Sequence, residues 1–370
     1  MTKTLPTRRR DFDLLRVCSM AAVVYLHTAA GALRQSPDTA LWHFSNVFAS
    51  LGTAAVPLFF MLSGSLLMSS EKTADPAYVL RRRVPRVLVP GLAWSLLIIA
   101  FIWVREGGAA ALSRLLALPY TTVLTPYWFL YALVPMYLLS PLLKRMVDNL
   151  ERRHWNYLMG LWVLVTLGLH TLRFFIPEPW NGLVTENMTL GVSLLEGYLG
   201  YFLLGPWLDG IRKLPSRGLL WAVFLADWAV IALGTWGMTS AKGWYGEWFS
   251  SYQGLFAMVL AASIFLLVKS CCGGGRGSGR RLVLLSSCSF GVYLAHPLAI
   301  KVVEWAWVRL TGGPSTGIPS QVCIWLAALA ACVLGVVLVS SVKPLCYLVP
   351  GQTFSTSCAE SNLFSLFRRR

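Results

Sequence analysis

Acidic residues are scarce in this chain, and so are charged residues of any kind. The 370 residues include 16 Asp and Glu, against 32 Lys and Arg. Charged residues make up 13% of the sequence and hydrophobic residues 56%, with a mean hydropathy of +0.60. A soluble protein of this length needs far more polar residues to cover its surface. The composition therefore excludes a soluble enzyme.

The sequence also lacks any pattern of metal ligands. Its eight cysteines are scattered along the chain without the spacing of a metal site or of a disulfide framework. We therefore expect free thiols, no metal site and no bound cofactor.

The formal charge of +16 raises the question of a nucleic-acid partner. The basic residues occur in short clusters that are separated by long apolar runs, which is typical of loops between membrane spans. We expect no nucleic-acid partner, and we interpret the excess of base as a signal of orientation in a membrane.

Ten apolar runs alternate with polar connections, and the first is long enough to cross a bilayer as a helix, so we interpret all ten as transmembrane helices. They predict an all-α, polytopic integral membrane protein that contacts membrane lipid directly. The runs are Leu14–Leu33, Val47–Met68, Val84–Val104, Tyr127–Leu143, Trp155–Leu172, Leu190–Leu208, Leu219–Trp236, Leu255–Val268, Leu282–Val303 and Val322–Val342.

Lys and Arg are concentrated in every second connection between these runs. Because cytoplasmic loops carry the excess of Lys and Arg, the pattern predicts that both termini are cytoplasmic. No segment has the composition of a soluble domain. We expect one transmembrane domain over residues 1–345 and a short cytoplasmic tail over residues 346–370.

Arg16 and His27 lie eleven residues apart in the first run. Eleven helical steps leave two side chains about 20° apart on one face and roughly 16 Å apart in depth. Ionisable groups at such depth are candidates for function. His27 is placed to act as a general base near the midplane, or to hydrogen-bond a neighbouring helix. Arg16 by itself is typical of an anchor at the cytoplasmic rim.

Arg81–Arg83 and Arg86 open the third predicted helix at its cytoplasmic end. Arg82 and Arg86 are spaced i,i+4 and Arg83 and Arg86 i,i+3, so their guanidinium groups face the same way in a helix. Such a fork matches phosphate oxygens, as in a nucleotide or coenzyme A. A plain cluster of positive-inside residues explains the same spacing.

Glu196 and His296 are further ionisable residues in the outer halves of predicted helices. His296 precedes Pro297, which removes a backbone donor and bends a helix. Both residues are candidates for contact with a substrate on the outer side.

Together these motifs resemble the membrane acyltransferase-3 family of integral O-acyltransferases. The resemblance rests on Arg16-x10-His27, Val56-Pro-Leu-Phe-Phe-Met-Leu-Ser-Gly-Ser65, Arg83-x-x-Arg86, Tyr127-Trp-Phe-Leu-Tyr-Ala-Leu133 and the Ser289–Pro297 segment. They occur in the family's order across the predicted spans. Members of similar length include the O-acetyltransferase of the enterobacterial common antigen.

The resemblance implies a multi-pass enzyme of the bacterial inner membrane. It would move an acetyl or other short acyl group from cytoplasmic acyl-CoA, a co-substrate, to a hydroxyl of a cell-surface or lipid-linked glycan. It implies that His27 is the catalytic histidine, with Arg16 as its inner partner, and that Arg82, Arg83 and Arg86 bind the donor. Larger relatives carry an added extracytoplasmic domain, so here we expect outer loops and helices to bind the acceptor. A polytopic transporter or flippase without acyl-transfer chemistry is the alternative.

Overall fold

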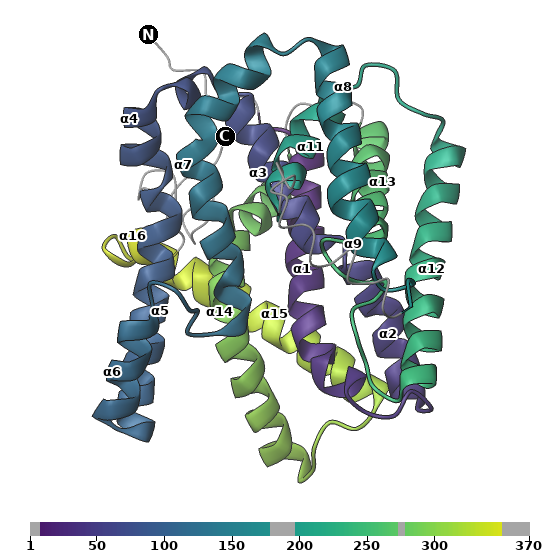
Figure 1. Cartoon of the computed structure of the whole chain (residues 1–370). Coiled ribbons are helices and arrows are strands. Elements are labelled where there is room, and N and C mark those ends of the chain that lie inside the picture. Colours follow the sequence, from purple (N-terminus) through teal and green to yellow (C-terminus); the bar gives the residue numbers. More distant parts are fainter. Residues whose placement is uncertain (1–7, 178–196, 273–277, 350–370) are drawn as a thin grey trace. The chain divides into compact units, whose positions relative to one another are not determined.

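The computed structural model describes residues 8–177, 197–272 and 278–349 (Figure 1), and within these ranges the regular elements are helices. The chain divides into two compact units that are interleaved along the sequence. Unit 1 contains Met1–Ser70, Lys144–Ser278 and Ser315–Val322. Unit 2 contains Glu71–Leu143, Gly279–Pro314 and Cys323–Arg370.

Unit 1 is built from long and short helices that pack on one another. Helix α1 packs on α2, α3 and α13, and α12 packs on α2 and α13. The helices are α1 (Arg10–Leu33), α2 (Ala40–Gly52), α3 (Ala55–Met68), α8 (Arg152–Leu161), the π-helix η4 (Trp162–Gly168), α9 (Leu169–Leu172), α11 (Leu199–Asp209), α12 (Arg217–Lys242) and α13 (Leu255–Cys272).

Unit 2 holds most of the remaining helices. In chain order they are η1 (Glu71–Ala74), α4 (Pro76–Tyr78), the π-helix η2 (Val79–Arg83), α5 (Pro85–Glu106), α6 (Gly108–Ala117), η3 (Thr125–Tyr127), α7 (Trp128–Asn149), α14 (Arg280–Thr311), α15 (Ile318–Ser340) and α16 (Leu345–Leu348). The last residues of α7 and the first of α15 are counted with unit 1.

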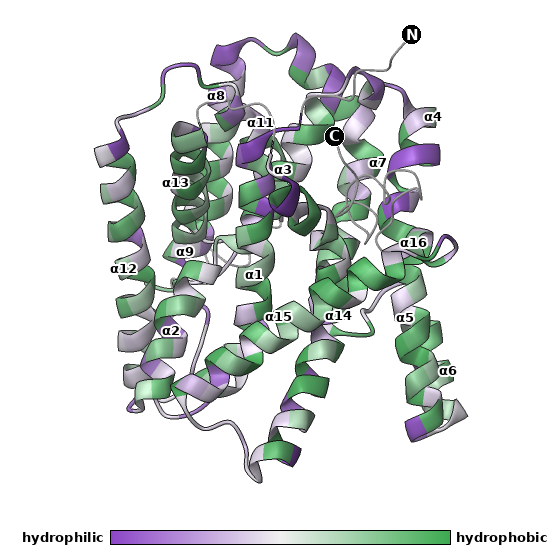
Figure 2. Ribbon diagram, turned by 180° about the vertical axis from the view of Figure 1, so that it is seen from behind, coloured by the Kyte–Doolittle hydropathy of each residue, from purple (hydrophilic) through white to green (hydrophobic). Residues whose placement is uncertain are grey.

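Eight helical stretches of the described residues are long and apolar enough to cross a membrane. Figure 2 shows the apolar character along α13. The eight stretches correspond to eight of the ten predicted spans, which confirms an all-α polytopic membrane protein. They are Arg10–Leu33, Ala40–Met68, Pro76–Glu106, Thr125–Asn149, Arg217–Lys242, Leu255–Cys272, Arg280–Thr311 and Ile318–Ser340.

The fifth and sixth predicted spans are not among these eight. The fifth is helical from Arg152 to Leu172, as α8, η4 and α9 in succession. The sixth is helical from Leu199 to Asp209, as α11, and residues 178–196 lie outside the described ranges. Both stay predictions as transmembrane spans.

The second predicted span is two helices rather than one. Helix α2 ends at Gly52 and α3 begins at Ala55. Pro57 explains the break, since it has no N–H to bond the carbonyl of Thr53 four residues earlier. The side-chain hydroxyl of Thr53 bonds back to the carbonyl of Ala49 at 3.3 Å. The N–H of Thr53 bonds the same carbonyl at 3.0 Å, so α2 keeps its backbone hydrogen bonds up to the break.

Glycines allow α3 and α11 to approach closely. A Cβ on Gly64 would lie 1.7 Å from the carbonyl oxygen of Phe202, and one on Gly205 would lie 2.0 Å from that of Met61. Small residues allow this kind of backbone contact between membrane helices. Pro206 leaves the carbonyl of Phe202 without its usual helical donor, and this is the carbonyl that faces Gly64.

Helix α6 was not predicted, and it follows α5 after a single residue. Gly107, the residue between them, has φ +94°. The turn at this residue lets α6 pack against α5. Glycine is favoured at such a backbone angle because it has no Cβ. The outer loop expected between the third and fourth spans therefore contains ten helical residues.

Candidate acyl-transfer site

Arg16 and His27 both lie on α1, which runs unbroken for 24 residues without a proline. The predicted helical spacing between them is therefore present, at about 16 Å along the axis. Arg16 is half-buried and His27 is exposed. The two side chains are thus held on one rigid element, one near its start and the other near its end.

The turn of α1 beyond His27 has open space around its glycine. Gly31 lies one turn beyond His27, and a Cβ there would meet no described atom within 4 Å. On the neighbouring face, Leu26 packs with Tyr245 against a cluster of Leu33, Trp42 and Ala49. Leu26 thus packs against other helical residues on one side of this turn, whereas the His27 side chain on the other side is exposed.

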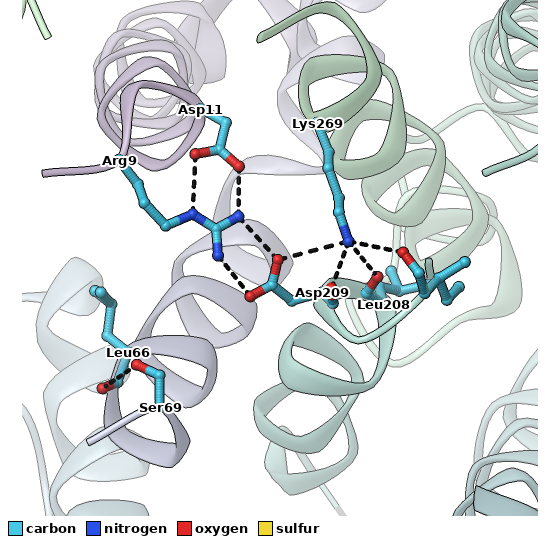
Figure 3. Close-up of polar contacts among 8 residues, drawn as sticks. Arg9, Asp11, Leu66, Ser69, Leu208, Asp209 and Lys269 are labelled. Atoms are coloured by element: carbon cyan, nitrogen blue, oxygen red, sulfur yellow. Dashed lines mark hydrogen bonds and ion pairs between the residues drawn. The ribbon is translucent and has the colours of Figure 1, made fainter. Parts of the chain in front are cut away.

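A charged cluster fixes the start of α1 (Figure 3). The Arg9 guanidinium binds the carboxylate of Asp11 at 2.6 Å and that of Asp209, at the end of α11, also at 2.6 Å. Lys269, near the end of α13, lies 3.6 Å from the Asp209 carboxylate and donates to the carbonyl of Leu208. The cluster joins the start of α1 to α11 and α13, and Arg9 lies seven residues before Arg16.

The charges of this cluster shift the pKa of Arg9. Burial by itself lowers that pKa, but hydrogen bonds to Asp209 and Asp11 outweigh it, so the net shift is upward. The guanidinium therefore stays charged, and its ion pairs persist at any physiological pH. Asp13 adds a second link, because its carboxylate accepts from Arg8 at 2.9 Å and from Ser278 at 2.6 Å.

The predicted donor arginines lie in unit 2, where the backbone differs from the expected α-helix. Val79–Arg83 is a π-helix, and the Val84 N–H bonds the carbonyl of Val79 rather than that of Leu80. Pro85 gives the physical reason, because its ring displaces the carbonyl of Arg81. Such π-turns are frequent at functional sites. The prediction of an α-helical fork of arginines was therefore wrong in its backbone geometry.

Within the described ranges, Arg82, Arg83 and Arg86 form no ion pair, in contrast to Arg8 and Arg9. Arg82 and Arg86 are exposed and Arg83 is half-buried. The Arg83 guanidinium lies 5.6 Å from the Tyr78 ring centroid. Its Nε atom is buried and has no hydrogen-bond partner there. These cations are available to an anionic ligand.

His296 is fully buried inside unit 2. Its Nδ1 lies 2.6 Å from the carbonyl oxygen of Tyr293. That carbonyl is the one that Pro297 deprives of its helical donor, so the imidazole replaces the missing N–H. The geometry gives His296 a structural contact, and its role toward an acceptor stays a prediction. Glu196, the other acceptor-side candidate, lies outside the described residues.

Two of the sequence motifs contact each other in unit 2. The hydroxyl of Tyr127 donates to the carbonyl of Leu294 at 2.8 Å, and that of Tyr293 donates to the carbonyl of Pro126. The rings of Phe129 and Tyr293 meet edge to face at 5.5 Å. Sequence reasoning missed this pairing, since 167 residues separate Tyr127 from Leu294.

One family model, the acyltransferase domain Acyl_transf_3, matches residues 9–341. The chain belongs to this family. The matched region begins at Arg9 and ends before the predicted tail, so it includes Arg16, His27 and the three arginines predicted to bind the donor. Together with the apolar helices, the match makes this acyltransferase a multi-pass membrane enzyme. No curated protein and no solved structure matches the chain.

Proposed function

We propose that this acyltransferase moves an acetyl or other short acyl group from cytoplasmic acyl-CoA to a hydroxyl of a cell-surface or lipid-linked glycan. The proposal places the enzyme in a bacterial inner membrane with both termini in the cytoplasm. The observation that carries it is the unbroken α1, which holds a half-buried arginine and an exposed histidine three turns apart on one face.

His27 acts as the general base in this proposal. It takes the proton of the acceptor hydroxyl while the hydroxyl oxygen attacks the carbonyl carbon of the thioester. The carbon–sulfur bond then breaks, and the thiolate of coenzyme A leaves and regains a proton from the imidazolium. A relay through an acyl-His intermediate is the second route compatible with the same residue.

The donor is bound by the arginines of unit 2. Arg82, Arg83 and Arg86 neutralise the phosphates of acyl-CoA, since within the described residues no carboxylate competes for them. Arg16 assists on the cytoplasmic side of His27. Within this proposal, Glu196 and His296 are candidates for orienting the acceptor.

The first test uses inverted membrane vesicles and radiolabelled acetyl-CoA. Wild-type protein transfers label to glycan, and His27→Ala does not. His154→Ala, which removes an exposed histidine on α8, serves as the matched control and keeps the activity. Equal labelling by wild type and His27→Ala would remove His27 from the mechanism. Glycan movement without label in the wild type would favour a transporter instead.

A second test separates the donor site from the acceptor site. Replacing Arg83 and Arg86 together by Gln should weaken acyl-CoA binding at least tenfold, because two charge-assisted contacts of about 1.5–3 kcal/mol each are lost. Equilibrium binding of acetyl-CoA to the purified protein measures this directly. Arg105→Gln, on the opposite end of α5, is the control and should bind as the wild type does. Unchanged affinity in the double variant would contradict the assignment.

A further inference from the structure

The loop between α12 and α13 combines aromatic residues with one acid. Residues 243–254 read GWYGEWFSSYQG, with five aromatic residues and Glu247 as the one carboxylate. The distribution of basic residues predicts that this loop lies on the outer side of the membrane. An acceptor on the cell surface would arrive from that side.

Contacts within unit 1 bring this loop to the half of α1 that carries His27. Tyr245 packs with Leu26, the neighbour of His27, against the cluster of Leu33, Trp42 and Ala49. The loop is also tied to two other helices. Ser251 Oγ lies 2.9 Å from His170 Nε2 on α9, and the hydroxyl of Tyr201 on α11 donates to the carbonyl of Tyr252 at 2.7 Å. The loop is therefore held in place next to the outer end of α1.

Two tryptophans of the loop form a pair that presents one ring to the outside. The Trp244 side chain is 59% exposed, and it rests on Trp248, which is 8% exposed. The ring centroids are 4.7 Å apart at an interplanar angle of 56°. A Cβ on Gly246 would come within 2.8 Å of both rings, so the pair needs glycine between them. A tryptophan that only anchors a helix at the membrane interface needs no such support.

Glu247 lies between the two tryptophans in the sequence, and its side chain is accessible. Within the described part of the chain it forms no ion pair. The protein around it removes part of its water and raises the pKa of its carboxyl group. A carboxylate that is partly desolvated without a cation beside it is typical of a ligand-binding position.

We propose that Trp244 and Glu247 bind the sugar of the acceptor, with the exposed indole stacked on the apolar face of a pyranose ring and the carboxylate accepting hydrogen bonds from its hydroxyl groups. This inference rests on the proposed function. Hydrogen bonds to a sugar hydroxyl give selectivity, because an acceptor without that hydroxyl leaves the partly desolvated carboxylate unpaired. Trp244 provides area and rigidity at a low cost in conformational entropy.

The experiment uses the purified full-length protein in detergent with radiolabelled acetyl-CoA. The acceptor is the envelope glycan extracted from source cells that lack the gene. Glycan and acetyl-CoA concentrations are varied separately for wild type, Trp244→Ala, Trp244→Phe and Glu247→Gln. The matched controls are Trp221→Ala, which removes an exposed tryptophan of α12, and Glu151→Gln, which removes an exposed carboxylate.

Trp244→Ala and Glu247→Gln should each raise the glycan concentration for half-maximal labelling at least tenfold and leave that for acetyl-CoA unchanged. Trp244→Phe should have an intermediate effect, because it keeps a ring that stacks. The controls should behave as the wild type does. Gel filtration and thermal unfolding show whether each variant is folded.

Three results would overturn the assignment. The first is that Trp244→Ala and Glu247→Gln need the same glycan concentration for half-maximal labelling as the wild type. The second is that the concentrations of glycan and of acetyl-CoA for half-maximal labelling change by the same factor. The third is a loss of thermal stability in Trp244→Ala with unchanged glycan dependence, which would make Trp244 an anchor at the membrane interface. The proposed function is contradicted by a different result, namely that wild type transfers no label or that His27→Ala transfers as much as wild type. In that case the proposed acceptor site is contradicted as well.

Discussion

Individual side chains replace the backbone donors that prolines remove. Pro297 leaves the carbonyl of Tyr293 without an N–H, and His296 lies 2.6 Å from it. Pro141 does the same to the carbonyl of Tyr137, and Ser140 donates to that oxygen at 2.7 Å. In both cases the residue directly before the proline makes the contact. Prolines can then bend α14 and α7 without leaving a buried carbonyl unpaired.

This contact predicts the effect of removing His296. His296→Ala should destabilise the protein by about 1–3 kcal/mol, because a buried carbonyl loses its donor. His296→Asn should recover part of the loss, since its amide can donate to the same oxygen. Thermal unfolding in detergent measures both, with His154→Ala as the exposed control. Unchanged stability combined with a weaker dependence on glycan would instead support a role of His296 at the acceptor.

Glu247 predicts a change of stability with pH. Because partial desolvation raises its pKa in the folded protein, the folded state holds the proton more tightly than the unfolded state does. The stabilisation from the bound proton is complete below the ordinary value of 4.5 and disappears as the pH rises through the raised value. Glu247→Gln should therefore unfold at a higher temperature than wild type at pH 8, and the difference should shrink toward pH 5. A constant difference would contradict the upward shift.

At the scale of helices, the closest contact is that between α3 and α11. Gly64→Ala should destabilise the protein by about 3 kcal/mol or more, because the new Cβ would lie 1.7 Å from a backbone carbonyl oxygen that cannot move without its helix. Gly237→Ala, on α12, is the matched control. A Cβ there meets no described atom within 4 Å, so this variant should be as stable as wild type or slightly more so. Equal stability of the two variants would show that α3 and α11 do not pack this closely.

The charged cluster of Arg9, Asp209 and Lys269 is the second contact that joins helices of unit 1. Asp209→Asn should cost about 1–3 kcal/mol, since it removes the carboxylate that two cations share. Asp38→Asn, an exposed site before α2, should have no measurable effect. Chemical unfolding in mixed micelles compares the two. A stable Asp209→Asn protein would mean that the contacts of Arg9 with Asp11 are sufficient.

The sequence predicts which segments are helices better than it predicts where they break. Long apolar runs identified eight spans, because a helix that crosses the lipid needs apolar side chains along its length. The break at Gly52–Ala55 was missed, although Pro57 signals it, because hydropathy does not change there. The helical spacing of Arg16 and His27 was predictable, since it needs only an unbroken α1. The pairing of Trp244 with Trp248 was not, because a loop conformation depends on the helices around it.

At the scale of the whole molecule, the orientation in the membrane is open to a direct test. In a background without other cysteines, Cys271 at the end of α13 should react with a membrane-impermeant maleimide only in inverted vesicles. Lys242→Cys, at the far end of α12, should react only in right-side-out cells. Both sites are exposed, so access across the membrane decides the result. Labelling of Cys271 from outside would reverse the predicted orientation.

Helix α14 has a consequence for the membrane around the protein. Its 32 residues are about 48 Å long, whereas the hydrocarbon layer of a bilayer is about 30 Å thick. A helix of this length must tilt, extend into the headgroups or thicken the lipid near it. Lipids with longer acyl chains would relieve this mismatch, and shorter ones would increase it. The length of α14 therefore favours a thick host bilayer.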